Sequence, residues 1–122
     1  MKINKITVQD LKDSPKDEGL VLQGCGGSLK EWVDGINDIL EQEGILKNGF
    51  HFENVSTFQN QGITCLLFPF DDGANIDIGK LSLWRIANHE NFGATWLSDY
   101  VMNYLDGYAE ESMDESSGIQ LN

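Results

Sequence analysis

The sequence is poor in the residues that build metal sites and disulfide frameworks, with two cysteines and two histidines among its 122 residues. Cys25 and Cys65 lie outside any CxxC pair, and neither histidine has the spacing of a zinc ligand. No metal site, catalytic constellation or cofactor is therefore predicted. In the absence of a secretory segment, both cysteines are expected to be reduced thiols.

Basic residues are also scarce, since 8 Lys and Arg stand against 20 Asp and Glu and leave a net charge of −12. Duplex phosphates would repel most of such a surface, so direct nucleic-acid binding is not expected. The sequence contains no run of about eighteen apolar residues and no basic start followed by an apolar stretch. We therefore expect a cytoplasmic protein with no membrane contact.

Hydrophobic residues, by contrast, are plentiful: they make up 40% of the chain and include six phenylalanines, three tryptophans and three tyrosines. This composition predicts a globular domain, which we assign to residues 1–108. Residues 109–122 contain four acidic residues, no base and no aromatic. Because such a segment cannot bury enough apolar surface to offset the entropy of ordering it, it is predicted to be a disordered acidic tail.

The clearest local pattern is an amphipathic helix over residues 29–43. Ser28 followed by Glu31 forms a capping box, and Gly44 provides a stop. Apolar side chains recur at helical spacing and leave the charged ones on the opposite face. The apolar positions are Leu29, Trp32, Val33, Ile36, Ile39 and Leu40.

The rest of the chain reads as strands joined by turns, with a second main helix near the end. Strands are predicted at 2–8, 20–22, 52–58, 63–68 and 75–78. The turn at 60–62 makes a hairpin of the third and fourth of these, and the nearly all-apolar strand 63–68 is predicted to be central. Residues 11–19 read as a polar connector.

Two further helices are predicted, at 80–88 and at 96–107, the latter capped by Thr95. The predicted fold is therefore α+β. It consists of an antiparallel sheet of about four or five strands, with the helices 29–43 and 96–107 packed on one face.

A glycine-rich loop precedes the first main helix and is the first candidate binding site. Backbone N–H groups and the positive end of the helix dipole converge there, a setting that binds anions and lowers the pKa of a thiol. A reactive Cys25 would need a base, which His51 or His89 could provide. The alternative is that the glycines make a tight strand-to-helix turn and Cys25 is an ordinary, partly buried residue. The candidate anion- or partner-binding residues of the loop are Gly24, Cys25, Gly26, Gly27 and Ser28.

Trp84 and Trp96 are the other candidates. Tryptophans on apolar stripes are usually core residues, and Trp32 is subject to the same interpretation. Two tryptophans that proved exposed and adjacent would instead mark a patch for a protein partner.

Four segments carry a resemblance to a known family: LVLQGCGGSLKEWVDGINDILEQEGIL (20–46), LLFPFDD (66–72), IGKLSLWR (78–85) and NFGATWLSDYV (91–101). They resemble small uncharacterised proteins from conjugative and other mobile elements of Gram-positive gut bacteria. The resemblance implies a mobile-element origin and an intracellular location. It supplies no catalytic residues.

Three functions follow as hypotheses. The first is a non-enzymatic acidic accessory factor of a mobile element that binds a protein partner. The second is a DNA mimic that inhibits a DNA-binding or restriction protein through its negative charge. The third is a small enzyme that uses Cys25.

Overall fold

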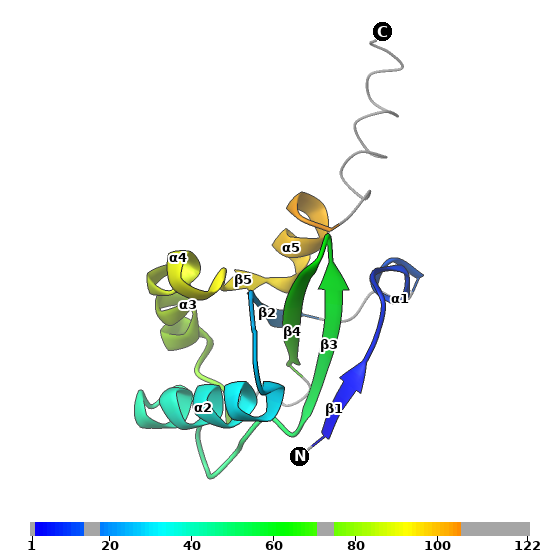
Figure 1. Ribbon diagram of the computed structural model, residues 1–122. Helices are drawn as coiled ribbons and strands as arrows, with labels where there is room; N and C mark the ends of the chain where they lie inside the picture. Colours follow the sequence, from blue (N-terminus) through cyan, green and yellow to red (C-terminus); the bar gives the residue numbers. More distant parts are fainter. Residues whose placement is uncertain (1, 14–17, 71–74, 106–122) are drawn as a thin grey trace, which may run out of the picture.

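The structure, a computed structural model, describes residues 2–13, 18–70 and 75–105, where a five-stranded sheet lies between helices (Figure 1). The predicted α+β class and the mainly antiparallel sheet are confirmed. The predicted tail at 109–122 lies outside the described residues. In spatial order the strands are β1 (Lys2–Lys5), β3 (Asn54–Asn60), β4 (Ile63–Pro69), β2 (Gly19–Gln23) and β5 (Thr95–Trp96).

The predicted hairpin forms the centre of the sheet. β3 and β4 pair in antiparallel register around Gln61 and Gly62, whose φ angles are both positive, at 53° and 80°. β4 lies between β3 and β2 and buries four consecutive side chains from Cys65 to Phe68. The central position predicted for this strand is confirmed. β1 is the exception to the antiparallel rule, because it pairs with β3 in parallel.

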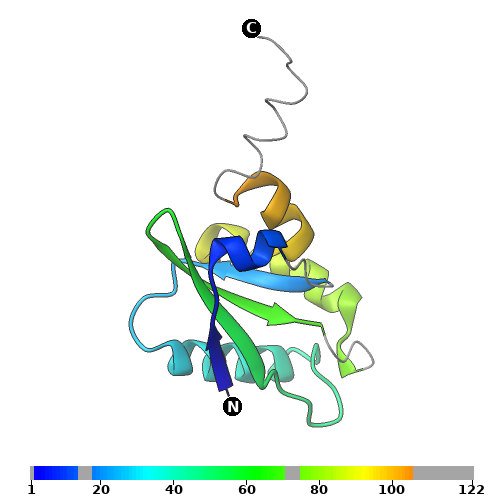
Figure 2. The same ribbon diagram turned by 90° about the vertical axis from the view of Figure 1, so that its right-hand side faces the viewer.

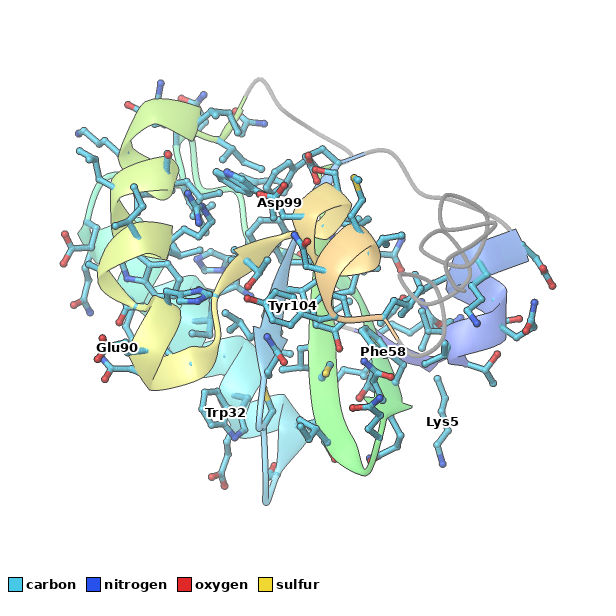
Figure 3. The ribbon with its side chains drawn as sticks, turned by 90° about the horizontal axis from the view of Figure 1, so that it is seen from above. Lys5, Trp32, Phe58, Glu90, Asp99 and Tyr104 are labelled. Carbon is cyan, nitrogen blue, oxygen red and sulfur yellow. The ribbon has the colours of Figure 1, made fainter. Side chains whose placement is uncertain are left out.

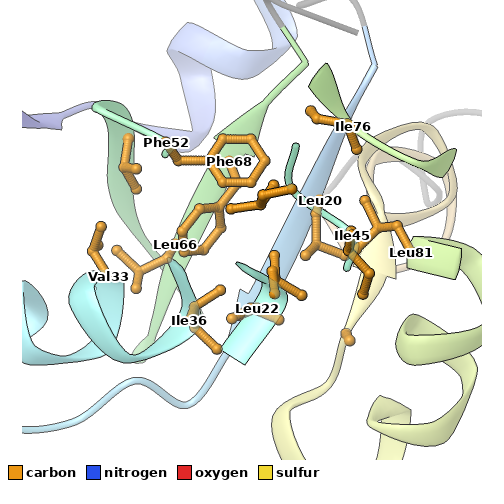
Figure 4. Close-up of a cluster of buried hydrophobic side chains, with 14 of the residues drawn as sticks. Leu20, Leu22, Val33, Ile36, Ile45, Phe52, Leu66, Phe68, Ile76 and Leu81 are labelled. Atoms are coloured by element: carbon orange, nitrogen blue, oxygen red, sulfur yellow. The ribbon is translucent and has the colours of Figure 1, made fainter. Parts of the chain in front are cut away.

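The sheet is covered on both faces, and each face has its own apolar cluster. Leu20 and Leu66 point towards α2 (Leu29–Gln42), whereas their neighbours Val21 and Leu67 pack with α5 (Leu97–Asn103). Figure 2 shows α2 on one side of the strands and α5 on the other, and Figure 4 shows the cluster beneath α2. The prediction that both helices pack on one face is therefore wrong. β2 and β4 are apolar on both faces, so both faces need a cover.

The prediction of a polar connector over residues 11–19 is also wrong in its first part, because α1 (Val8–Asp13) begins before it. Thr7 and Asp10 cap this helix reciprocally: each backbone N–H donates to the other's side-chain oxygen, at 2.8 and 3.0 Å. Leu11 is buried in the α5-side cluster. Because α1 begins at Val8, β1 ends at Lys5 and is shorter than the strand predicted at 2–8.

The segment after β4 is more helical than predicted. The strand expected at 75–78 is reduced to a single bridge between Leu46 and Ile76. α3 (Ile78–Ala87) follows at once, because the side chain of Asp77 accepts the N–H of Lys80 at 3.1 Å. A short helix, α4 (His89–Phe92), then ends at a left-handed Gly93.

The second main helix, α5, begins one residue later than predicted, and the residue at its N-cap is not the predicted one. Thr95 lies in β5, where its hydroxyl donates to the carbonyl of Gly93, so it does not cap the helix. Trp96 occupies the capping position and forms no side-chain cap bond. Within the described residues α5 ends at Asn103 rather than at 107.

Candidate functional site

The glycine-rich loop makes the turn from β2 into α2. Gly24 and Gly27 adopt positive φ angles of 77° and 78°, which favour glycine. The N–H groups of Gly24 and Cys25 both donate to the carbonyl of Thr64, at 2.9 and 3.1 Å, and that of Gly26 donates to the carbonyl of Gly24. These three donors are therefore engaged by β4 and by the loop itself and are not aimed at a ligand.

The loop ends in the predicted cap. The hydroxyl of Ser28 accepts the N–H of Glu31 at 3.4 Å, which is the first half of the capping box. The Glu31 side chain lies exposed in the first turn of α2, where a negative charge interacts favourably with the helix dipole.

Cys25 is enclosed by the fold, with 1% of its surface exposed. Burial raises the pKa of its thiol to about 12, with a further contribution from Cys65. The described contacts of the two histidine rings lie elsewhere: His51 is 3.2 Å from Glu41, and His89 Nδ1 is 3.1 Å from the carbonyl of Ala94. Cys25 is a neutral thiol at physiological pH, which is the form that is a poor nucleophile.

The loop contributes to a surface groove between α2 and α4, which we call the α2–α4 groove. Its volume is about 350 Å³. Its long side is one stripe of α2, and Phe92 of α4 closes the opposite side. Figure 3 shows Trp32 next to this short helix, on the same side of the molecule as Glu90. The lining residues are Gly26, Gly27, Ser28, Glu31, Trp32, Gly35, Ile36, Ile39 and Phe92.

Three aromatic rings contact one another in series at this groove. Trp32 meets Phe92 edge to face, with ring centroids 5.5 Å apart and planes at 88°. Trp84 lies on the other side of Phe92, nearly parallel to it, with centroids 6.3 Å apart. The indole N–H of Trp32 donates to the carbonyl of Gly26 at 2.8 Å. The ring orientations are thereby fixed by both packing and a hydrogen bond.

The structure thus brings some of the predicted site residues together and separates others. Gly26, Gly27 and Ser28 line the groove, and Trp84 supports it from behind. Trp96 lies apart, with its ring against Phe70 and beneath the Arg85 guanidinium, which is 5.0 Å from the ring centroid. None of the three tryptophans is fully exposed.

Sequence reasoning missed an exposed apolar surface on α3, which we call the α3 face: Leu83, Ile86 and Ala87. Leu83 and Ile86 are 70% and 60% exposed, and Ala87 is exposed beside them. The sequence of α3 could have indicated this surface, because its apolar residues lie on every side of the helix. In the structure, Leu81 is its one buried residue. Gly35 and Phe92 were also missed, although a glycine in the interior of a helical pattern is a recognisable signal.

Within the described residues, no group of three His, Cys, Asp or Glu side chains could hold a metal ion. No described helix is long and apolar enough to span a membrane. Searches of protein families, curated proteins and solved structures find no match to this chain.

Proposed function

We propose that this protein is a non-enzymatic accessory factor, of mobile-element origin as the sequence resemblance implies, that binds a partner protein through the α3 face. The observation that carries the proposal is the exposure of Leu83 and Ile86, at 70% and 60%, on a helix that buries one side chain. Fully burying a leucine or isoleucine is favourable by about 1.5–3 kcal/mol. A partner that covers both would gain much of that free energy.

The distribution of carboxylates supports this reading over the DNA mimic. A mimic needs a row of free negative charges, and the outer side of α2 offers Glu31, Asp34, Asp38 and Glu41. Lys30 lies 2.6 Å from Asp34, and His51 lies 3.2 Å from Glu41. The row is thus interrupted by a cation at one position and by a titratable histidine at another, which weakens its likeness to a phosphate backbone.

The enzyme hypothesis has the least support. Burial and a raised pKa leave Cys25 protonated at neutral pH. A nucleophilic cysteine needs a lowered pKa or an adjacent base.

The test is affinity capture from cells that carry the protein naturally, with three baits compared. The first bait is the wild type, and the second carries Leu83→Ser and Ile86→Ser on the α3 face. The third carries Asp38→Lys and Glu41→Lys on α2, outside the α2–α4 groove. If the proposal holds, the α3 variant weakens binding of the captured partner about tenfold or more, as expected when apolar anchors are lost.

Salt dependence separates the two binding hypotheses further. Apolar contacts respond little to ionic strength, whereas Coulomb steering fades beyond about 10 Å at 0.1 M salt. A partner whose association slows steeply with salt, and which is lost with the charge-reversed bait but not with the α3 variant, would contradict the proposal and favour the mimic.

A further inference from the structure

We propose that the α2–α4 groove receives a cationic side chain, lysine or arginine, presented by a partner protein. This inference rests on the proposed function for the source of the side chain. It adds a second contact site, distinct from the α3 face, and specifies the charge of the side chain that binds there.

The walls of the groove are suited to a cation. Trp32 and Phe92 both line it, and their rings meet edge to face at 88°, which gives the groove an aromatic corner. The face of an aromatic ring is electronegative and attracts a cation within about 6 Å of the ring centroid. The hydrogen bond from the Trp32 indole to Gly26, and the stacking of Trp84 on Phe92, hold this corner in place without a ligand.

The groove also has the matching charge, since the unit negative charge of Glu31 outweighs the roughly half-unit positive charge at the N-terminus of α2. Among the described residues that line it, Glu31 is the one with a charged side chain, and none is Lys, Arg or His. Among the described residues Lys30 forms an ion pair with Asp34, and His51 contacts Glu41. The Glu31 carboxylate forms no close ion pair within that part of the chain, although Lys30 is near enough to interact with its charge. An anion would meet this carboxylate and a loop whose first three N–H groups are already bonded. A cation meets an aromatic corner and the Glu31 carboxylate in a protein of net charge −12.

Gly35 gives the groove room for the stem of a long side chain. It lies within α2, where glycine is less favourable than alanine by about 1 kcal/mol. A Cβ atom at this position would meet nothing within 4 Å, so packing inside the protein does not explain the glycine. The open floor between Trp32 and Ile39 fits the methylene stem of lysine or arginine, which buries apolar atoms while its charged head stays near Glu31.

The groove can be tested with small capped amino acids before any partner is known. N-acetylarginine amide is titrated into ¹⁵N-labelled protein at constant ionic strength, and N-acetylcitrulline amide serves as the uncharged control of the same shape. We expect saturable shifts of the Trp32 indole N–H and the Gly35 amide, with the Trp96 indole unmoved. The dissociation constant should be roughly millimolar, and about threefold or more tighter for the charged probe. Equal binding of both probes, or no saturable shift at Trp32, would overturn the inference.

Two variants of equal charge then separate a specific site from general attraction. Glu31→Gln removes the groove carboxylate, and Asp38→Asn removes a charge from the same helix outside the groove. We expect Glu31→Gln to weaken arginine amide binding about threefold and Asp38→Asn to have a clearly smaller effect. Equal losses would reduce the effect to net charge and overturn the inference.

The outcome is distinguishable from that of the proposed function. If the groove binds the cation specifically but the partner does not depend on Leu83 and Ile86, only the proposed docking on the α3 face is contradicted. If the partner depends on the α3 face but the groove binds no cation, only the inference about the groove is contradicted.

Discussion

The helices α2 and α3 both contribute to the apolar cluster on one face of the sheet, yet they relate to the fold in opposite ways. α2 has 14 residues and places its buried apolar residues, Val33, Ile36 and Leu40, on one stripe that faces the sheet. α3 has 10 residues, most of them apolar, and it buries Leu81 alone. The apolar surface of α2 is therefore used in folding, whereas that of α3 exceeds what the fold can cover.

This difference separates stability from recognition. A side chain that is already removed from water contributes to the free energy of folding, and its loss is felt in the free protein. A side chain that stays in contact with water contributes only when another molecule covers it. Substitutions on the two helices should therefore separate effects on stability from effects on binding.

The largest contrast is expected between two leucine truncations. Leu40→Ala on α2 should lower the free energy of unfolding by about 3 kcal/mol, because Leu40 is fully buried and its loss leaves a cavity. Leu83→Ala on α3 should change it by less than about 0.5 kcal/mol, because the side chain is 70% exposed. Urea unfolding measures both. A loss above about 1 kcal/mol for Leu83→Ala would mean that the α3 face is covered in the free protein.

Asn37 provides the next contrast, this time within α2. Its buried side-chain amide donates to the carbonyl of Phe52 at 3.0 Å and accepts the N–H of Phe52 at 2.8 Å. Asn37→Ala leaves both backbone groups without these partners and should lower the free energy of unfolding by about 2 kcal/mol. Gln42→Ala, on an exposed position of the same helix, is the control. Similar losses for the two variants would show that the paired bonds to Phe52 add nothing.

The caps of the two helices should differ by less. Asp77 caps α3 with a bond of 3.1 Å and a negative charge, and Ser28 caps α2 with a longer bond of 3.4 Å. Each alanine substitution should cost about 1 kcal/mol, and Asp77→Ala should cost more because the charge also interacts with the helix dipole. Thermal unfolding at matched pH compares the two variants. A larger loss for Ser28→Ala would reverse the expected order.

The smallest effect has the opposite sign. Gly35→Ala should raise the free energy of unfolding by about 0.5–1 kcal/mol, because alanine favours the helix and the added methyl group meets nothing. The same change should weaken cation binding in the groove. Gly79→Ala in the first turn of α3 is the matched control, which should leave the groove unaffected. A destabilised Gly35→Ala protein would show that glycine serves the fold rather than the groove.

The sequence was sufficient wherever the cause of a structure is local. The helix predicted at 29–43 is observed at Leu29–Gln42, because its cap and its apolar period lie within the segment itself. The hairpin was equally readable from the turn at 60–62. α1 was missed although its signal was also local, since Thr7 and Asp10 form a capping box three residues apart.

The features that could not be predicted from the sequence depend on contacts between distant segments. The sequences of β2 and β4 did not reveal which helix would cover which face, because the buried residues of both strands are apolar on both faces. The groove depends on contact between Trp32 and Phe92, which are sixty positions apart in the sequence and are separated by β3, β4 and α3. Only the tertiary fold brings these residues together.

The two edges of the sheet have a consequence for how this protein meets other chains. β5 is two residues long, and β1 is a short strand with exposed lysines at both of its ends, Lys2 and Lys5. Short edges and lysine side chains discourage the addition of a further strand, which is the usual route to sheet-mediated aggregation and to peptide capture by main-chain pairing. An aromatic-rich protein with such edges can stay dispersed while it keeps apolar side chains in water, so recognition is left to the helices.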